Sequence, residues 1–207
     1  MPKQEVPLHT LEKYIPAGSI HKVLQFLTTY KIHLTITKQR QTLLGDYRHA
    51  HQGKAHRISV NGNLNAYSFL ITLLHEVAHL LAFEKYGGGI LPHGKEWKNE
   101  FSNVLGTFLT DKIFPKDIED ALTVSIKNPA ASSCGDVQLM RVLKNYDSKA
   151  DGLFTIEQLE TGTLFKIKDG RIFIKGEKVR TRYKCKEVGT QKLYLFNGLY
   201  EVMIGNR

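Results

Sequence analysis

The sequence contains few of the features that hold secreted or membrane-spanning proteins together. Its 207 residues include only two cysteines, Cys134 and Cys185, whose wide separation predicts free thiols in a reducing compartment. Residues 1–5 lack the apolar core of a signal peptide. The apolar stretch from Leu64 to Phe83 is interrupted by imidazole and carboxyl groups, and it falls short of the ~20 continuous apolar residues of a membrane span. We therefore expect a cytoplasmic protein with no membrane partner.

Histidine is absent after His93, although the chain has nine histidines, so any histidine chemistry belongs to the first half. Positive charge is concentrated at the other end. From Leu164 to Arg207, eleven Lys and Arg stand against four Asp and Glu, which places seven of the nine net positive charges there. This imbalance predicts acidic partners, with nucleic acid first, and says nothing about the fold.

The apolar stretch contains the sequence His75-Glu76-Val77-Ala78-His79. An α-helix turns every 3.6 residues, so His75 and His79 lie on one face, one turn apart. The stretch is apolar nearly all round, which predicts a buried helix, with an N-cap at Asn63 and an end at the glycines 87–89. Burying two imidazoles and a carboxyl group in such a helix costs free energy unless something compensates them.

A zinc ion would compensate them, because neutral imidazole nitrogens suit Zn²⁺. Glu76 lies about 100° further round the helix, where its carboxylate can accept a proton from a zinc-bound water. This is the H-E-x-x-H arrangement of zinc hydrolases. The alternative interpretation is a buried helix whose two histidines donate hydrogen bonds to backbone carbonyls.

A catalytic zinc usually has three protein ligands, and His93 is the next candidate. Thirteen residues separate it from His79, which is enough for a glycine-rich reversal of the chain. A second predicted helix follows, with apolar residues recurring on one side. These residues are Trp97, Phe101, Val104, Leu105 and Phe108. We therefore expect His93 to enter the site from the start of that second helix.

The order of these motifs resembles that of the SprT-like zinc metalloproteases, the group that includes Spartan. Their pattern is H-E-x-x-H, a short connection and then H-G-x-x-F/W, which here reads His75 to His79 followed by His93-Gly94-Lys95-Glu96-Trp97. An upstream Gly-x-Tyr stretch (residues 45–47) is similar too, and the resemblance covers roughly residues 15–125. It implies hydrolysis of proteins bound or crosslinked to DNA.

The chain departs from that family after the catalytic region. Many SprT-like proteins carry a C-terminal zinc ribbon with two Cys-x-x-Cys pairs, and two cysteines cannot supply four thiolates. From Leu153 onward, short strands separated by glycine turns instead predict a small antiparallel sheet or barrel. We expect this module to be basic and to hold no structural zinc.

These patterns predict an α+β fold. Residues 1–128 form a zincin-like metallopeptidase domain, 129–152 a linker with a short helix, and 153–207 a small all-β domain. The first domain has a small antiparallel or mixed sheet ahead of the H-E-x-x-H helix. Its further predicted elements are helices at 18–29 and 115–125 and strands at 31–37, 42–48 and 56–60. An exposed edge of that sheet, formed by the second or the third strand, would pair with an extended substrate.

Two groups of residues have open roles in the first domain. Tyr67, Tyr86 and Lys95 are each candidates for stabilising the oxyanion. The polar loop histidines form either a second metal cluster or, as we favour, part of a solvated loop. These histidines are His49, His51 and His56.

The segment from Asp147 to Gln158 resembles an EF-hand calcium loop only at some positions. Lys149 stands where a carboxylate or amide ligand belongs, and Gln158 stands where a bidentate glutamate belongs. The segment therefore predicts an Asp-Gly turn that precedes a strand.

A basic stripe is the main feature of the last domain. Arg180, Arg182, Lys184 and Lys186 alternate along one predicted strand and so project from one face, with Val179, Tyr183 and Cys185 pointing inward. Like charges in a row repel each other, so the stripe predicts contact with DNA phosphates. The alternative is a solvated strand face that keeps a small domain soluble.

Together, these features predict a zinc metalloendopeptidase with one catalytic Zn²⁺, bound by His75, His79 and His93, with Glu76 as the base. Its partners would be a protein substrate and DNA. One alternative is a nucleic-acid-binding module with a non-catalytic metal site. Another is zinc-dependent hydrolysis of something other than a protein.

Overall fold

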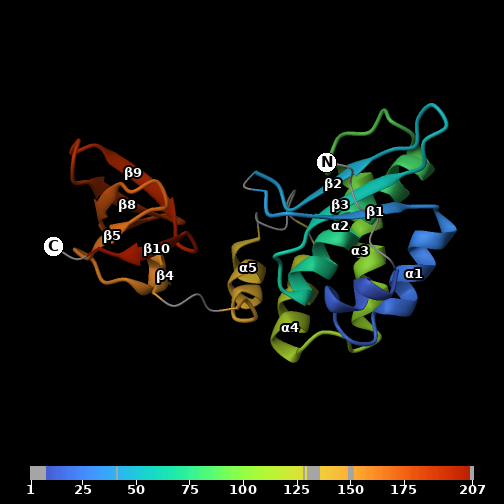
Figure 1. Ribbon diagram of the computed structural model, residues 1–207, viewed down its shortest axis with the longest axis horizontal. Coiled ribbons are helices and arrows are strands. Elements are labelled where there is room, and N and C mark those ends of the chain that lie inside the picture. The colour runs from blue at the N-terminus through green and yellow to red at the C-terminus, as the bar shows by residue number, and fades with distance from the viewer. Residues whose placement is uncertain (1–7, 41, 128, 130–135, 149–151, 206–207) are drawn as a thin grey trace. The chain divides into compact units, whose positions relative to one another are not determined.

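The computed structural model describes residues 8–40, 42–127, 129, 136–148 and 152–205. The chain divides into two compact units, Met1–Asp147 and Ser148–Arg207. The first unit combines helices with a small sheet and the second is built mainly from strands, so the fold is α+β (Figure 1). The helices of the first unit are η1 (Leu8–Lys13), α1 (Ile20–Thr29), α2 (Ala66–Tyr86), α3 (Lys95–Leu109), α4 (Lys116–Ser125) and α5 (Val137–Lys144).

The sheet of the first unit is mixed and has the order β1-β3-β2. Strand β1 (His33–Thr37) runs parallel to β3 (Arg57–Asn61), while β2 (Gly45–Arg48) pairs with β3 in the antiparallel direction. The sequence did not decide whether the second or the third strand forms an edge of the sheet. Because β3 is central, the second strand, β2, is an edge. The sheet packs against α2, so β2 lies beside the helix that carries the H-E-x-x-H motif.

Helix α2 is the core of the first unit. Its apolar residues are buried on nearly all sides, and the helix ends at Gly87, whose φ of 76° suits glycine. Its N-cap is Asn65, whose side-chain oxygen accepts a hydrogen bond from the Ser68 amide at 2.9 Å, so the expected cap at Asn63 was wrong. By length and composition α2 could cross a membrane, but 67% of its apolar window is buried within the unit, as in the core helix of a soluble protein.

Helix α3 packs against α2, and the side of α3 that the sequence predicted to be apolar is buried. The five apolar residues Trp97, Phe101, Val104, Leu105 and Phe108 are all buried. Their burial anchors the start of α3, and therefore the segment that carries His93, against the middle of α2.

Helix α5 belongs to the first unit, although the sequence suggested a linker over 129–152. Leu139 and Leu143 are buried in the core of this unit. The Asn65 amide group donates hydrogen bonds to the Leu143 carbonyl at 3.0 Å and to an Asp147 carboxylate oxygen at 2.6 Å. Asp147, the first position of the segment that resembles a calcium loop, thus binds the start of α2. Residues 149–151 of that segment lie outside the described residues.

The second unit contains an antiparallel sheet of the order β4-β10-β5-β6-β8-β7, with β9 paired to β8 (Figure 1). Its core is small and includes Phe165, Phe173 and Cys185, while Cys134 lies outside the described residues. The short 3-10 helix η3 (Ile156–Gln158) follows the first strand. The strands are β4 (Leu153–Thr155), β5 (Leu164–Lys166), β6 (Ile172–Ile174), β7 (Lys178–Val179), β8 (Arg182–Glu187), β9 (Leu193–Asn197) and β10 (Glu201–Ile204).

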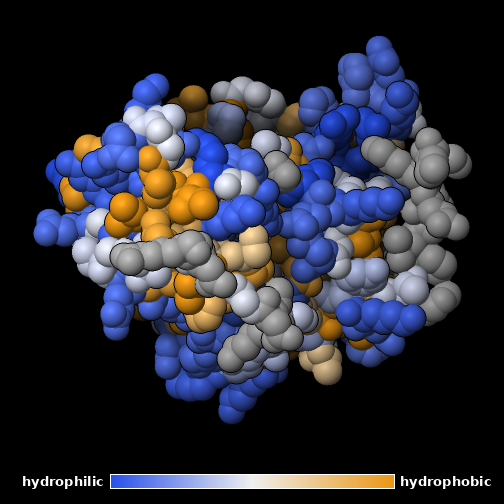
Figure 2. All heavy atoms as spheres, turned by 60° about the vertical axis from the view of Figure 1, so that its left-hand side comes forward, coloured by the Kyte–Doolittle hydropathy of each residue, from blue (hydrophilic) through white to orange (hydrophobic). Residues whose placement is uncertain are grey.

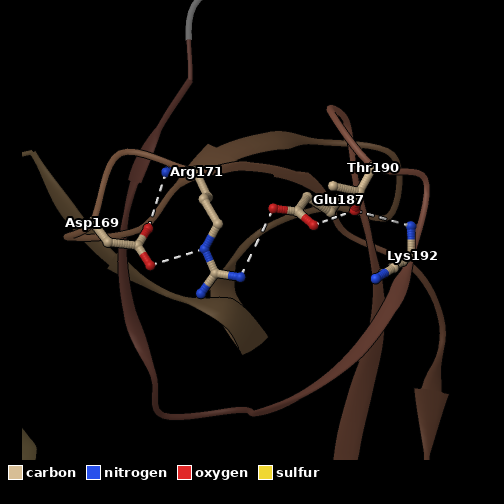
Figure 3. A network of polar contacts seen from close by, with 5 residues as sticks. All are labelled: Asp169, Arg171, Glu187, Thr190 and Lys192. Carbon is tan, nitrogen blue, oxygen red and sulfur yellow. Dashed lines mark hydrogen bonds and ion pairs between the residues drawn. The ribbon is translucent and has the colours of Figure 1, made fainter.

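A polar network joins two turns of this second unit (Figure 3). The Arg171 guanidinium lies 2.8 Å from an Asp169 carboxylate oxygen and 3.8 Å from one of Glu187. The Thr190 hydroxyl donates to the other Glu187 oxygen. Glu187 is buried, so these contacts compensate a carboxylate that would otherwise be costly to bury. Arg171 is consequently engaged within the fold and is not part of a free basic surface.

Candidate metal centre

Three imidazoles meet at one point of the first unit. α2 places His75 and His79 one turn apart, and the connection before α3 brings His93 to them. The Nε2 atom of His93 lies 3.1 Å from that of His75 and 3.0 Å from that of His79. Among the described residues, these three form a group whose ligand atoms all lie within 4.8 Å of one another. The structure thus brings together the three histidines that the sequence singled out.

The donor set fits a metal ion. Three nitrogens bound to a tetrahedral zinc at roughly 2.0–2.1 Å would lie about 3.3 Å apart, close to the separations seen here. His93 Nε2 faces two other Nε2 atoms, and a neutral imidazole can offer a proton to only one of them. A cation between the three lone pairs would satisfy all of them.

The environment also keeps these histidines neutral, as metal ligands must be. Burial lowers the pKa of His75 to about 3, with smaller contributions from His79 and His93. Burial likewise lowers the pKa of His79 to about 4, and it lowers the pKa of His93. Because burial disfavours the protonated imidazoles, the nitrogen lone pairs stay available to bind a metal ion.

Backbone conformation and packing explain the residue types of the H-G-x-x-W segment. His93 adopts a left-handed backbone conformation with a φ of 58°, which is uncommon outside glycine. A Cβ at Gly94 would lie 3.0 Å from the Leu91 carbonyl oxygen, tighter than side chains normally allow. The fully buried Trp97 ring lies 4.6 Å from the His75 ring and 4.7 Å from the His93 ring, measured between centroids. Trp97 therefore packs against two of the three histidine rings and restricts the positions that they can adopt.

Glu76 is held beside the three histidines and not among them. Its side chain is 7% exposed and lies against Gly45 of β2, where an added Cβ would come within 2.4 Å of Oε1. Burial, helped by the negative charge of Asp46 and opposed by Arg40, raises the pKa of Glu76 to about 8. A carboxyl group whose pKa lies near neutrality is suited to exchanging protons.

The structure separates the three residues considered for the oxyanion. Tyr67 packs against Tyr146, with ring centroids 5.0 Å apart, near the start of α2. Tyr86 donates a hydrogen bond to Glu100 at 3.4 Å at the other end of that helix. Lys95 lines a cavity of about 320 Å³ together with His93.

Tyr47 is a site residue that the sequence reasoning missed. It lines a cavity of about 220 Å³ together with His79 and His93. Its hydroxyl lies 3.0 Å from Nδ1 of His56, whose Nε2 lies 3.3 Å from a Glu84 carboxylate oxygen. The signal was available, because Tyr47 and Gly45 are two residues apart on β2 and therefore face the same side, toward α2.

The loop histidines do not gather into a second cluster among the described residues. His56 is buried and bonded as described, and the His49 ring stacks on Phe83 with centroids 4.7 Å apart. His51 is exposed, and its backbone forms an isolated bridge with Lys54.

The basic stripe is shorter than the sequence suggested. Arg182, Lys184 and Lys186 are exposed on one face of β8, with Tyr183 and Cys185 turned inward. Arg180 lies in the turn between β7 and β8, with a φ of 56°, and Val179 is 46% exposed, so neither follows the predicted alternation. The reason is that Val179 pairs with Arg182 across a two-residue turn, which interrupts the strand.

Aliphatic side chains flank the three cations of β8. Leu195 is paired with Lys184 and Leu193 with Lys186, and these two leucines are 54% and 58% exposed. Figure 2 shows apolar side chains gathered among hydrophilic ones on the face that comes forward. Among the described residues, no ion pair involves the cations of this face. The surface is therefore both basic and partly apolar.

Comparisons with known proteins agree with the motif. The model of the SprT-like family matches residues 19–118. Protein SprT from Pseudomonas syringae pv. tomato is 60% identical over 35 residues, which is 16% of this chain and 21% of that protein. Protein SprT from Pseudomonas savastanoi pv. phaseolicola is 57% identical over 35 residues, with the same coverage.

The matched stretch thus spans about a fifth of the length of these curated relatives. No solved structure matches the chain. The family match contains the three histidines, Glu76 and the edge strand β2. Over residues 19–118, the chain is therefore similar to the SprT-like family.

Proposed function

We propose that the first unit is a zincin-like, zinc-dependent metallopeptidase of SprT-like type. The observation that carries this proposal is the convergence of three Nε2 atoms, with His93 3.0 and 3.1 Å from the other two, beside a buried carboxyl group that is not a ligand. Three ligands leave the fourth tetrahedral position open, as in catalytic and not structural zinc sites.

Each residue of the site has a separate role in the proposed peptide hydrolysis. When bound, zinc supplies an activated water and polarises the substrate carbonyl. His75, His79 and His93 hold the ion, and Trp97 fixes the orientation of their rings. Glu76 accepts the proton of the attacking water and passes it to the leaving amine. In the metal-free chain, burial raises the pKa of Glu76 to about 8, which favours the protonated carboxyl group at pH 7. The positive charge of a bound zinc ion would favour the ionised form, which is the form that accepts a proton.

The edge strand β2 is evidence that the substrate is a protein. Among the described strands, β2 pairs only with β3, and its residues Gly45 and Tyr47 face the histidine helix. An extended peptide that added to this edge would run past Glu76 and the metal ligands, held by backbone hydrogen bonds. Binding of this kind uses the substrate backbone, so any preference for particular side chains has to come from pockets beside the strand.

The test compares wild type with Glu76→Gln and His93→Ala. Glu76→Gln should retain one zinc per chain and lose cleavage of unfolded protein substrates by roughly 10²–10⁴-fold, because Gln cannot accept the proton. His93→Ala should lose zinc affinity as well. Equal cleavage by wild type and Glu76→Gln would remove Glu76 as the base. Zinc binding without cleavage by any variant would favour the alternative of a binding module with a non-catalytic metal.

We also propose that the substrates are proteins associated with DNA. The resemblance to Spartan-type proteases suggests this class, and the unpaired cations Arg182, Lys184 and Lys186 on one face of β8 support it. Addition of DNA should accelerate cleavage of a DNA-binding protein and leave cleavage of a protein that does not bind DNA unchanged.

A further inference from the structure

The cavity that Tyr47 lines is distinct from the metal position but opens beside it. Its volume is about 220 Å³. β2 contributes Tyr47, α2 contributes Phe83, and the glycine-rich connection contributes residues between Gly87 and Pro92. His79, His93 and Trp97 form the inner end, so a group in this cavity would lie next to the metal ligands.

The cavity follows from the way β2 runs along α2. Gly45 contacts Glu76, Tyr47 shares the cavity with His79, and His49 stacks on Phe83. Alternate residues of a strand are about 6.8 Å apart and successive turns of a helix about 5.4 Å, so each alternate residue of β2 lies beside roughly the next turn of α2 over this short distance. A peptide on the edge of β2 would therefore pass Glu76, then the histidines, then Phe83.

The walls of the cavity are suited to an apolar group. Among the described residues, no lysine, arginine, aspartate or glutamate lines it. The Tyr47 hydroxyl is already engaged by His56 at 3.0 Å, so the cavity meets mainly its ring. The nearby Glu84 carboxylate is paired with the same His56 at 3.3 Å. Apart from backbone groups and the imidazoles of His49, His79 and His93, the lining offers a charged side chain no partner, whereas an aliphatic or aromatic one would be removed from water.

We infer that this cavity is the specificity pocket of the enzyme and takes one large apolar side chain, of leucine or phenylalanine size, from the residue beside the scissile bond. The inference rests on the proposed peptidase function. The volume would hold about seven waters at roughly 30 Å³ each, which is more than an alanine side chain fills. Phe83 and Tyr47 are the specificity-determining residues, because their rings line it from α2 and β2.

The glycine-rich connection offers a matched pair of variants. A Cβ at Gly88 would point at Phe83, 3.6 Å from its Cε2, so Gly88→Leu places a side chain in the cavity. A Cβ at the neighbouring Gly89 meets nothing within 4 Å, and Gly89 does not line the cavity, so Gly89→Leu is the control. Neither glycine has the positive φ that would make a leucine strained.

The probes are two zinc-binding hydroxamates, N-acetyl-glycine hydroxamate and N-acetyl-leucine hydroxamate, titrated calorimetrically into the zinc-loaded full chain. Their binding requires no catalysis. Wild type and Gly89→Leu should bind the leucine probe roughly 10-fold or more tighter than the glycine probe, the discrimination typical of an apolar pocket. Gly88→Leu should lose that preference and still bind the glycine probe.

Each outcome decides a separate question. A leucine probe that binds wild type no tighter than the glycine probe overturns the pocket while leaving the metal centre intact. Equal loss of preference in Gly88→Leu and Gly89→Leu also overturns it. A preserved leucine preference in a protein that cleaves no substrate supports the pocket and rejects the peptidase function. Failure of both probes to bind rejects the pocket and the metal centre together.

Discussion

Replacing Gly45 by alanine should disable Glu76 without disturbing the metal ligands. A Cβ at Gly45 would lie 2.4 Å from Glu76 Oε1, 2.8 Å from Cγ and 2.9 Å from Cδ. Side chains essentially never approach this closely, so the Glu76 side chain or the strand must move. Gly45 does not have a positive φ, so alanine meets no backbone strain at this position, and the effect is steric alone.

The displacement should fall mainly on Glu76. β2 is fixed by its pairing with β3, where Gly45 is opposite Val60, and α2 is buried on nearly all sides. Overpacking of this kind costs about 1–3 kcal/mol of unfolding free energy. A catalytic group displaced by about 1 Å can lose ~10²-fold in rate. Because the three atoms nearest the added Cβ all belong to Glu76, zinc stoichiometry should be unchanged.

Three measurements test this, with Gly106→Ala as the control. Gly106 lies inside α3, and its added Cβ would meet only Ile126, at 3.9 Å, so alanine there should raise the unfolding free energy by roughly 0.5–1 kcal/mol. The measurements are peptidase rate, zinc per chain and unfolding in denaturant. Gly45→Ala with an unchanged rate and an unchanged unfolding free energy would refute the close packing of β2 on Glu76. Parallel loss of zinc would show that the strand positions the ligands as well.

Two further predictions concern stability. In metal-free Glu76→Gln, the unfolding free energy should fall by roughly 2–4 kcal/mol between pH 7 and pH 5, because the unfolded state protonates histidines whose folded-state pKa values are about 3 for His75 and about 4 for His79. In the wild type, Glu76 opposes this fall in unfolding free energy, because a carboxyl group with a folded-state pKa of about 8 binds a proton in the folded state first as the pH falls. If the unfolding free energy fell more steeply in the wild type than in Glu76→Gln, the raised pKa of Glu76 would be contradicted. Asn65→Ala should lower the unfolding free energy by about 1–2 kcal/mol through loss of the α2 cap, whereas Asn63→Ala, at an exposed position, should change it little.

The sequence was sufficient for the parts of the site that depend on local periodicity. The spacing of His75 and His79 follows from one helical turn, and the apolar side of α3 follows from its 3.6-residue repeat. The third histidine could be named because its connection to α2 is short. These features depend on contacts between residues that are near in sequence, where the patterns are most informative.

Other features depended on distant residues or on single dihedral angles. Asn63 and Asn65 are equally good caps in sequence, and Asn65 is selected by its contacts with Leu143 and Asp147 about eighty residues away. The position of Tyr47 depends on the pairing of β2 with β3, and the sequence patterns did not predict the order of the strands in the sheet. Arg180 does not belong to the basic stripe because its own φ is positive, a conformation that is uncommon for residues other than glycine and that the sequence therefore did not predict.

The basic face of the second unit leads to the last prediction, because DNA and an acidic protein would use it differently. Phosphates need only the three cations of β8, so duplex DNA should bind with a slope of log affinity against log salt of about −2.7, or −0.9 per contact. Lys184→Glu/Lys186→Glu should reduce that slope by about 1.8, and Arg180→Glu, in the turn, should reduce it less.

The flanking leucines supply the discriminating measurement. Leu193→Ser/Leu195→Ser removes exposed apolar surface next to the cations and leaves every positive charge in place. Because phosphates gain little from aliphatic neighbours, DNA affinity and its salt slope should stay unchanged in this variant. A loss of DNA affinity with an intact fold, or an unchanged slope in Lys184→Glu/Lys186→Glu, would reject phosphate binding by β8. The mixed basic and apolar face would then match an acidic protein partner better, because such a partner would use both kinds of side chain.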